Sequence, residues 1–136
     1  MMIMIEAKNS ISTFLTFAGN AEAAMDFYVS LFEEAEVFSK TYIGEEDRGE
    51  TGKLLTGVFA LRGQSFMVMD MESEFLTPLT WATSILVQCQ DEAEFDRLFA
   101  AFSEGGSVMM GPVEMGPFKK VTWVTDKFGL TWQLVW

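Results

Sequence analysis

The sequence predicts an α+β protein built from two tandem modules, each with the order strand, helix, strand, strand, strand. Two amphipathic helical segments favour this fold, because each follows a β-rich run and precedes further β-rich runs separated by glycine-containing turns. The leading strand and helix also repeat at a fixed offset along the chain. With 136 residues, 49% of them hydrophobic, the chain fits one domain or two half-size modules that share a core.

The first module opens with a strand over residues 11–17, which ends at Gly19 and Asn20, a turn and helix-cap pair. A helix is expected over residues 21–34, with Glu22 near its N-terminus, where the helix dipole favours an acidic side chain. The apolar positions of this helix recur at helical spacing: Ala24, Met25, Tyr28, Leu31 and Phe32.

Three strands complete the first module. A strand over residues 36–43 is followed by the polar, glycine-bounded loop 44–52. Strands over 54–61 and 65–70 then flank a turn at residues 62–64, so we expect them to pair as a hairpin.

The second module repeats this order. A strand over residues 83–90 leads to Asp91, which is expected to cap a helix that ends at Gly105 and Gly106. One face of this helix is apolar and carries Phe95, Leu98, Phe99 and Phe102. The remaining strands are expected over residues 107–110, 119–125 and 130–136, with Gly111-Pro112 and Gly116-Pro117 in a loop between the first two.

A shift of 70 residues superposes the two modules with six identities in the leading strand and helix. We therefore interpret the chain as a duplicated module. Within a single domain over residues 1–136, the first module covers 10–70, the linker 71–80 and the second module 81–136. The matching pairs are Thr13 and Thr83, Glu22 and Glu92, Ala23 and Ala93, Asp26 and Asp96, Phe32 and Phe102, and Glu34 and Glu104.

The charge of the chain excludes several classes of partner. Twenty acidic side chains against nine basic ones give a net charge of 9 − 20 = −11. Such a chain repels phosphate backbones and anionic lipid, and its basic residues are scattered, so we expect neither nucleic acid nor membrane as a partner.

The chain contains no histidine and one cysteine, Cys89. The missing imidazole removes the usual general base at neutral pH and the commonest transition-metal ligand. A single cysteine excludes an intramolecular disulfide and paired-thiolate zinc sites, and it fits a reducing compartment. We interpret Cys89 as a small buried strand residue, which is simpler than a role as a nucleophile. No apolar run is long enough to span a membrane, and residues 1–6 lack the pattern of a signal peptide, so we expect a soluble cytoplasmic protein.

Several of these segments together resemble the PhnB-like branch of the vicinal oxygen chelate superfamily, which includes glyoxalases, bleomycin-resistance proteins and dioxygenases. The resemblance extends over nearly the whole chain and rests mainly on turn and core residues, which identify a fold better than a reaction. It is carried by the run from Gly19 to Tyr28 with Leu31-Phe32, by Gly63-Gln64-Ser65-Phe66, by Glu104-Gly105-Gly106 and by the ending from Asp126 to Leu134.

The resemblance implies two βαβββ modules whose curved sheets form a cup, commonly completed in a homodimer in which modules pair across chains. Many relatives carry a label as demethylubiquinone methyltransferases. The chain has no strand followed by a glycine-rich turn and a helix that would cradle a nucleotide-like cofactor, so we expect neither this activity nor a cofactor.

Metal-using members of the superfamily place one ligand on the first and one on the last strand of each module. Carried over through the repeat, these positions are Thr13, Thr83 (or Ser84), Met67 (or Val68) and Gln133. Only Gln133 offers a metal ligand. A transition-metal centre needs two or three imidazole or carboxylate ligands, so we expect no metal.

Two hypotheses about function remain, beside the third possibility of a dimeric housekeeping protein whose cup is vestigial. The first is a metal-free binding module that holds an apolar or aromatic, neutral or cationic small molecule in the cup, as the bleomycin-resistance relatives hold a drug. The second is an enzyme of glyoxalase or isomerase type in which Asp70, the one carboxylate near the cup, acts as the base. A strand-end aspartate that bonds locally to the backbone is the competing interpretation of Asp70. The expected lining of the cup is Thr13, Leu15, Phe17, Met67, Met69, Trp123 and Gln133.

Overall fold

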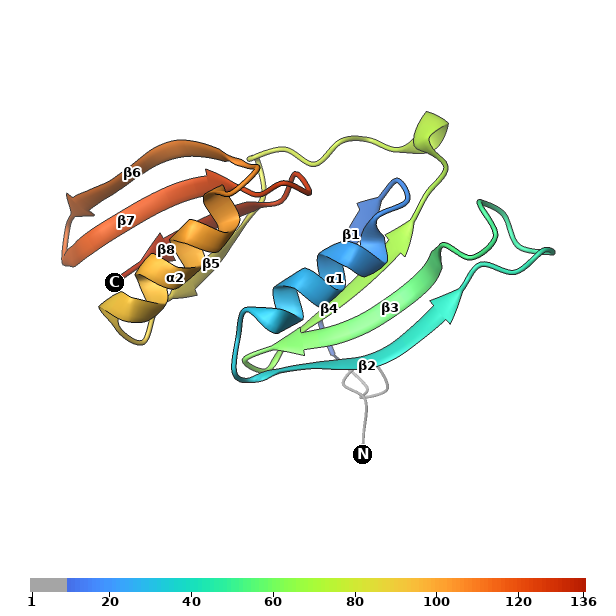
Figure 1. The fold of residues 1–136 in the computed structure, drawn as a ribbon, viewed down its shortest axis with the longest axis horizontal. Coiled ribbons are helices and arrows are strands. Elements are labelled where there is room, and N and C mark those ends of the chain that lie inside the picture. The colour runs from blue at the N-terminus through green and yellow to red at the C-terminus, as the bar shows by residue number, and fades with distance from the viewer. Residues whose placement is uncertain (1–9) are drawn as a thin grey trace. The chain divides into compact units, whose positions relative to one another are not determined.

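The computed structural model describes residues 10–136, and the chain divides into two compact units between Leu76 and Thr77 (Figure 1). The first unit contains β1 (Thr13–Phe17), α1 (Ala21–Ser30), β2 (Ala35–Tyr42), β3 (Leu54–Leu61) and β4 (Gln64–Asp70), followed by a short 3-10 turn at Ser73–Phe75. The second unit contains β5 (Ser84–Gln88), α2 (Glu92–Ser103), β6 (Ser107–Met115), β7 (Phe118–Thr125) and β8 (Thr131–Val135). The predicted α+β class and the two βαβββ modules are confirmed.

Both units have the same sheet topology. The strand order is β1-β4-β3-β2 in the first sheet and β5-β8-β7-β6 in the second. In each sheet the first and last strands of the unit pair in parallel and the other neighbours pair antiparallel. The edge strands β2 and β6 therefore occupy equivalent places in the two units.

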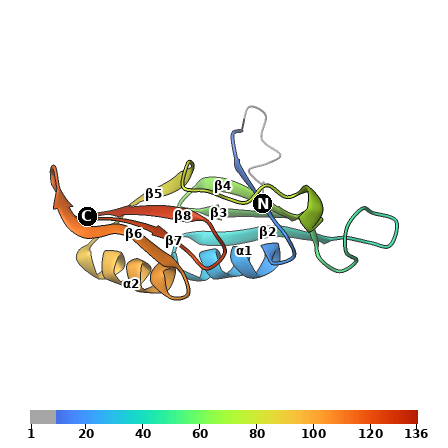
Figure 2. The same cartoon turned by 90° about the horizontal axis from the view of Figure 1, so that it is seen from above.

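Each helix lies against one face of its own sheet (Figure 2). In the first unit Met25 and Tyr28 of α1 are fully buried, and Phe59 and Phe66 stack with ring centroids 5.0 Å apart. Gly57 of β3 permits this close approach, because a Cβ atom there would lie 2.9 Å from the Met25 side chain. The side of each sheet opposite its helix is called the helix-free face below.

In the second unit Phe102 of α2 stacks on Trp132 of β8 with ring centroids 4.3 Å apart. The Trp132 indole donates from Nε1 to Oδ2 of the buried Asp126 over 2.9 Å. Asp126 also accepts from the backbone N–H groups of Phe128 and Leu130 in the turn before β8. Asp126 thus holds the core and the turn together, as expected for an aspartate at a strand end.

The two helices begin differently. Asp91 accepts from the N–H of Glu94, and Glu94 in return accepts from the N–H of Gln90, which makes a capping box at the start of α2. The side chain of Asn20 makes no capping bond at α1. Helix α1 also ends at Ser30, earlier than expected, and Leu31 is its C-cap residue.

One predicted loop is wrong. Strand β6 continues through Gly111 and Pro112 to Met115, and only residues 116 and 117 form the turn to β7. Proline is tolerated there because β6 is an edge strand, and the register shifts between Met110 and Val113. The hydroxyl of Thr122 on β7 donates to the Met110 carbonyl and supports the irregular segment. None of the helices in residues 10–136 is long and apolar enough to cross a membrane.

Candidate functional site

The register of the first sheet separates the expected lining residues of this unit into two groups. Thr13, Leu15 and Phe17 are alternate residues of β1, and Leu15 and Phe17 are buried on the side that α1 covers. The β4 residues that pair with them alternate with Met67 and Met69 along the strand. Because neighbouring residues of a strand point to opposite faces, the two methionines point to the helix-free face. The five residues therefore do not form one surface, and only the two methionines lie on the helix-free face.

The second sheet brings its two expected residues together. Trp123 on β7 and Gln133 on β8 are direct partners, and both lie on the helix-free face because Trp132, the neighbour of Gln133, packs on α2. The Gln133 amide donates to the Ser84 hydroxyl on β5 over 2.8 Å. Trp81 approaches from the segment before β5, with its ring centroid 6.1 Å from that of Trp123.

These side chains give the helix-free face of the second sheet a mixed aromatic and neutral polar character. Leu86 on β5 and Trp81 are each 61% exposed, and Trp123 and Gln133 are half-buried. Within the strands β5 to β8 the charged residues are Glu114, Lys119 and Lys120. Lys120 turns toward α2, and Lys119 alternates with it onto the face of Trp123. Glu114 lies where the register of β6 shifts, and no carboxylate pairs with Trp123 or Gln133.

The sequence analysis missed two residues of this surface. Trp81 falls at the start of the expected second module, ahead of its leading strand, and Leu86 was not distinguished from its strand neighbours. Alternation along β5 places Leu86 with Ser84, but only the pairing of β5 with β8 shows that both lie beside Gln133.

Asp70 lies on the helix-facing side of β4. It is 7% exposed and accepts from the N–H groups of Gly19 (2.7 Å), Ala21 (3.0 Å) and Leu54 (3.0 Å). The carboxylate therefore ties the turn after β1, the start of α1 and the start of β3 to the end of β4. It supplies the anionic cap that Asn20 does not, and it places no base on the helix-free face.

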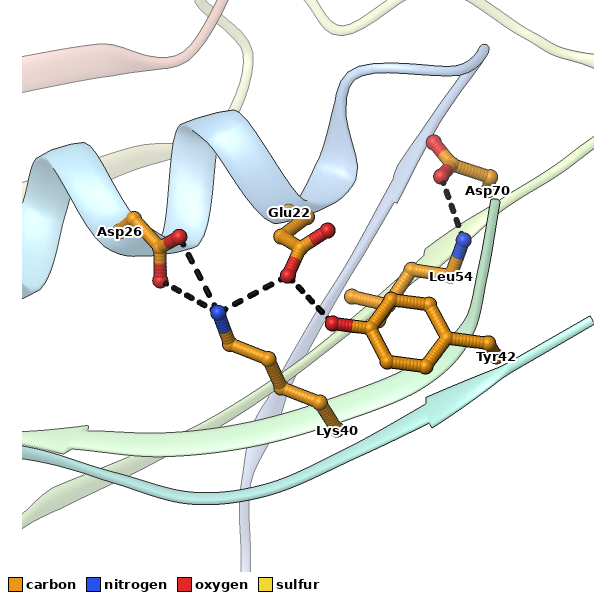
Figure 3. A network of polar contacts seen from close by, with 6 residues as sticks. All are labelled: Glu22, Asp26, Lys40, Tyr42, Leu54 and Asp70. Carbon is orange, nitrogen blue, oxygen red and sulfur yellow. Dashed lines mark hydrogen bonds and ion pairs between the residues drawn. The ribbon is translucent and has the colours of Figure 1, made fainter. Parts of the chain in front are cut away.

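A second polar network joins α1 to the edge strand β2 (Figure 3). The ammonium of Lys40 lies 2.9 Å from Glu22 and 3.1 Å from Asp26, and the hydroxyl of Tyr42 donates to Glu22 over 2.6 Å. The hydrogen bonds from Tyr42 and Lys40 lower the pKa of Glu22, and the bonds to Glu22 and Asp26 raise the pKa of Lys40. The hydrogen bond to Glu22 also raises the pKa of Tyr42.

The second unit has a matching network. Lys120 on β7 lies 2.7 Å from Asp96 and 2.9 Å from Glu92, and these bonds raise its pKa. The two acidic pairs are the repeated residues that the offset of 70 superposes. These ion pairs join each helix to a strand of its own sheet.

The positions that correspond to metal ligands in the superfamily offer little coordinating chemistry. Thr13 lies on the helix-facing side, Met67 on the helix-free face, and the amide of Gln133 is engaged with Ser84. Residues 10–136 contain no group of three or more histidine, cysteine, aspartate or glutamate side chains placed to hold a metal ion. Cys89 is buried. The donor set does not fit a transition-metal centre built from imidazole and carboxylate ligands.

Two hollows lie in the first unit, away from the expected lining residues. One of about 280 Å³ is bordered by Gly19, Lys53 and the segment 70–74. The other, of about 410 Å³, is bordered by residues 33–36 and contains three glutamates in its border. Neither borders the methionines of β4, and neither contains a group of metal-ligating side chains.

The family model for 3-demethylubiquinone-9 3-methyltransferase matches residues 9–135, nearly the whole chain. The chain belongs to this family. The PhnB-like resemblance seen in the sequence is confirmed by this match and by the solved structure of a PhnB protein that carries the same family name. None of the curated proteins compared with the chain matches it.

Solved structures agree with this assignment. A PhnB protein from Bacillus cereus is 38% identical, with a TM-score of 0.86 over 93% of this chain and 98% of that chain. A fosfomycin resistance protein from Listeria monocytogenes is 17% identical, with a TM-score of 0.61 over 95% and 94%. A glyoxalase/bleomycin resistance protein from Albidiferax ferrireducens is 12% identical, with a TM-score of 0.59 over 92% and 96%. The last two show a shared fold alone.

Proposed function

We propose that this PhnB-like protein binds a small, largely apolar or aromatic molecule, neutral or cationic, without a metal. The observation that carries the proposal is the helix-free face of the second sheet, where Trp123 lies beside the Gln133–Ser84 pair. An indole offers a broad apolar surface for stacking, and an amide with a hydroxyl offers neutral hydrogen bonds that orient a ligand. Exposed Trp81 and Leu86 extend the apolar surface.

The charge of the protein supports the proposed ligand class. The net charge of −11 lowers the local concentration of anions and raises that of cations. No carboxylate pairs with Trp123 or Gln133 in the second sheet, so a neutral aromatic ligand stacked on this indole does not have to desolvate a buried charge. Met67 and Met69 give the first sheet a similar apolar, adaptable surface.

The alternative function, proton transfer by a carboxylate base, gains no support from the geometry. Asp70 accepts three backbone N–H bonds on the helix-facing side. Glu36, the other carboxylate in the strands of the first sheet, is exposed on the edge strand β2. A methyltransferase of the doubly wound type also needs a nucleotide-binding crossover at a parallel sheet, whereas each sheet here contains one parallel pair.

A thermal-shift screen over small aromatics, antibiotics and quinones tests the proposal, because a ligand that binds the native state raises its melting temperature. We expect hits among neutral and cationic aromatics, and a hit should lose affinity about tenfold or more in Gln133→Leu and Trp123→Leu. Phe75→Leu, a change at an exposed aromatic residue of the first unit, is the matched control and should bind normally. Hits confined to anionic metabolites would contradict the proposal.

We also propose that the protein is a cytoplasmic homodimer. The single buried cysteine fits a reducing compartment. A pair of copies would cover exposed apolar side chains that one copy leaves in contact with water. A monomeric mass of 15.3 kDa by light scattering at micromolar concentration would contradict the dimer.

A further inference from the structure

Gln133 lies between two apolar side chains on the helix-free face of the second sheet. Strand β8 runs between β5 and β7, and Gln133 pairs directly with Leu86 on one side and with Trp123 on the other. Directly opposite residues of an antiparallel pair have Cβ atoms about 5 Å apart, so a ring stacked on the Trp123 indole lies within reach of the Gln133 amide. The amide is therefore the polar group nearest to the proposed stacking surface.

A single hydrogen bond orients this amide. The Gln133 nitrogen donates to the Ser84 hydroxyl over 2.8 Å, and both residues are half-buried. A primary amide has two N–H groups and one carbonyl oxygen. The bond to Ser84 thus leaves one N–H donor and the carbonyl acceptor of Gln133 without a partner among residues 10–136. Because the amide is already oriented, a ligand that pairs with it pays less in lost side-chain freedom.

The side chains around the amide are uncharged. Alternate residues of a strand share a face, so the pairing of β5, β8 and β7 places three successive rows on the helix-free face. These rows are Leu86, Gln133 and Trp123; Ser84, Thr131 and Thr125; and Gln88, Val135 and Val121. None of the nine side chains is ionisable. An ionic group of a ligand would therefore lose hydration over these rows without gaining an opposite charge.

Two indoles border the amide. The ring centroids of Trp81 and Trp123 are 6.1 Å apart, and the ring planes are inclined at 45°. This inclination leaves part of each ring outside their mutual contact, and Trp81 is 61% exposed. Flat aromatic rings in contact attract each other by more than their buried area alone provides. The surface is therefore suited to a planar ligand.

A donor beside an acceptor selects a ligand with the complementary pair. A cyclic amide carries a ring N–H next to a carbonyl oxygen, so its N–H donates to the Gln133 oxygen while its carbonyl accepts from the Gln133 N–H. An ammonium group offers donors alone. A carboxylate offers acceptors alone and is repelled by the net charge of −11. Each ion leaves one polar group of the amide unpaired, which is costly where a ligand excludes water.

We propose that the helix-free face of the second sheet binds a planar, uncharged heterocycle with a cyclic-amide edge, which Gln133 recognises by two hydrogen bonds. Ser84 is the positioning residue that orients the Gln133 amide, and Trp123 supplies the stacking surface. The inference rests on the small-molecule binding proposed above and narrows its ligand class.

Calorimetric titration with 2-quinolone and N-methyl-2-quinolone tests this inference. The two probes share their fused rings and carbonyl, but the methyl group removes the ring N–H. The wild-type protein should bind 2-quinolone about tenfold more tightly, because the N-methyl compound leaves the Gln133 oxygen unpaired. Gln133→Leu should bind both probes equally. Ser84→Ala should reduce the preference to about threefold or less, since the amide loses its fixed orientation.

The control variant is Ser39→Ala, at a half-buried strand serine of the first unit, and it should keep the full preference for 2-quinolone. Circular dichroism establishes that each variant folds. Gln133→Met, which keeps the length of the side chain, replaces Gln133→Leu if the leucine variant does not fold.

The possible outcomes separate this inference from the wider proposal. Equal binding of the two quinolones by the wild-type protein, or binding of neither, would contradict the cyclic-amide ligand, whereas the thermal-shift screen decides aromatic binding on its own. A preference that persists in Gln133→Leu would show that the methyl group is excluded by shape, and it would contradict recognition by Gln133. A full preference in Ser84→Ala would contradict the positioning role of Ser84.

Discussion

Asp70 shows how one residue sets the local structure of the first unit. Three N–H groups from three separate segments converge on its two carboxylate oxygens. Hydrogen bonds to a charged acceptor are stronger than neutral ones, and buried N–H groups are costly to leave unpaired. Helix α1 is therefore capped by the Asp70 side chain, which lies 49 residues from Ala21 in the sequence, and not by a neighbouring residue.

Asp70→Asn should lower the free energy of unfolding by about 2–4 kcal/mol. The asparagine amide has one acceptor oxygen, and its NH2 group would face a backbone N–H group that needs an acceptor. Urea denaturation followed by circular dichroism measures the change. Asp47→Asn, at an exposed carboxylate that accepts one N–H bond from Gly44, is the control and should cost less than about 1 kcal/mol. Equal losses of unfolding free energy in the two variants would show that the burial of Asp70 and its three N–H bonds add no stability beyond that of one exposed bond.

The elements of the two units share an architecture but differ in what stabilises their ends. Helix α2 begins with a local capping box, whereas α1 begins on the Asp70 carboxylate from β4. Each helix is also held to its sheet by one lysine that lies between two carboxylates four residues apart. Like charges at that spacing repel, so each lysine neutralises a repulsion that the helix itself creates.

Asp91→Ala should lower the free energy of unfolding by about 1 kcal/mol, the usual effect of losing an N-cap side chain. Asn20→Ala at the other helix should change it by much less, since the Asn20 side chain makes no capping bond. Thermal and urea unfolding of the two variants compare the helices directly. An equally large loss from Asn20→Ala would contradict the role assigned to Asp70 at α1.

The stability difference between the wild-type protein and Lys40→Met should depend on pH. Because folding lowers the pKa of Glu22, the ionised Glu22 stabilises the folded protein at pH values above its ordinary pKa of about 4.5. This stabilisation is lost as the pH falls through the folded-state pKa. Because folding raises the pKa of Lys40, the charged Lys40 stabilises the folded protein at pH values below its ordinary pKa of about 10.5. This stabilisation is lost as the pH rises through the folded-state pKa.

We therefore expect a difference of a few tenths to about 1 kcal/mol between roughly pH 5 and pH 10, the usual size for solvent-screened pairs. The difference should shrink toward pH 3, as the pH falls toward and through the lowered pKa of Glu22. Urea denaturation at pH 3, 7 and 9 measures it. A difference that stays constant over this range would point to lost packing of the lysine stem instead of lost charge.

At the scale of the whole molecule, most acidic side chains of residues 10–136 lie on the helices and in the loops. The eight strands carry Glu36, Asp70 and Glu114. An anionic ligand must therefore enter against the field of the whole chain, while a cation is attracted before it makes contact.

A matched pair of aromatic probes, 1-naphthylmethylamine and 1-naphthoate, tests this effect of charge. The cation should bind more tightly at low ionic strength, and the ratio of the two affinities should fall toward one in 0.5 M salt, because salt screens long-range charge. Titration by tryptophan fluorescence or calorimetry measures both. Tighter binding of the naphthoate, or a ratio insensitive to salt, would contradict the electrostatic account.

The sequence by itself determined the class and order of the elements in this protein. Periodicity identified α2 and its cap Asp91, glycine turns separated the strands, and the offset of 70 residues revealed the duplication. These features depend on local backbone preferences and on side chains close in sequence. The boundary at Ser30 and the path of β6 through Pro112 were missed. Proline is tolerated in β6 because this strand lies at the edge of its sheet, a position that the local sequence does not show.

The tertiary structure decided which residues share a surface. Alternation along β1 shows that Thr13, Leu15 and Phe17 lie together, but it does not show which face the helix covers. That face is set by the packing of α1 and by the pairing of β1 with β4, contacts between segments some fifty residues apart. The same long-range pairing turned Asp70 toward backbone N–H groups and brought Trp123 beside Gln133, because register follows from the packed sheet and not from local sequence.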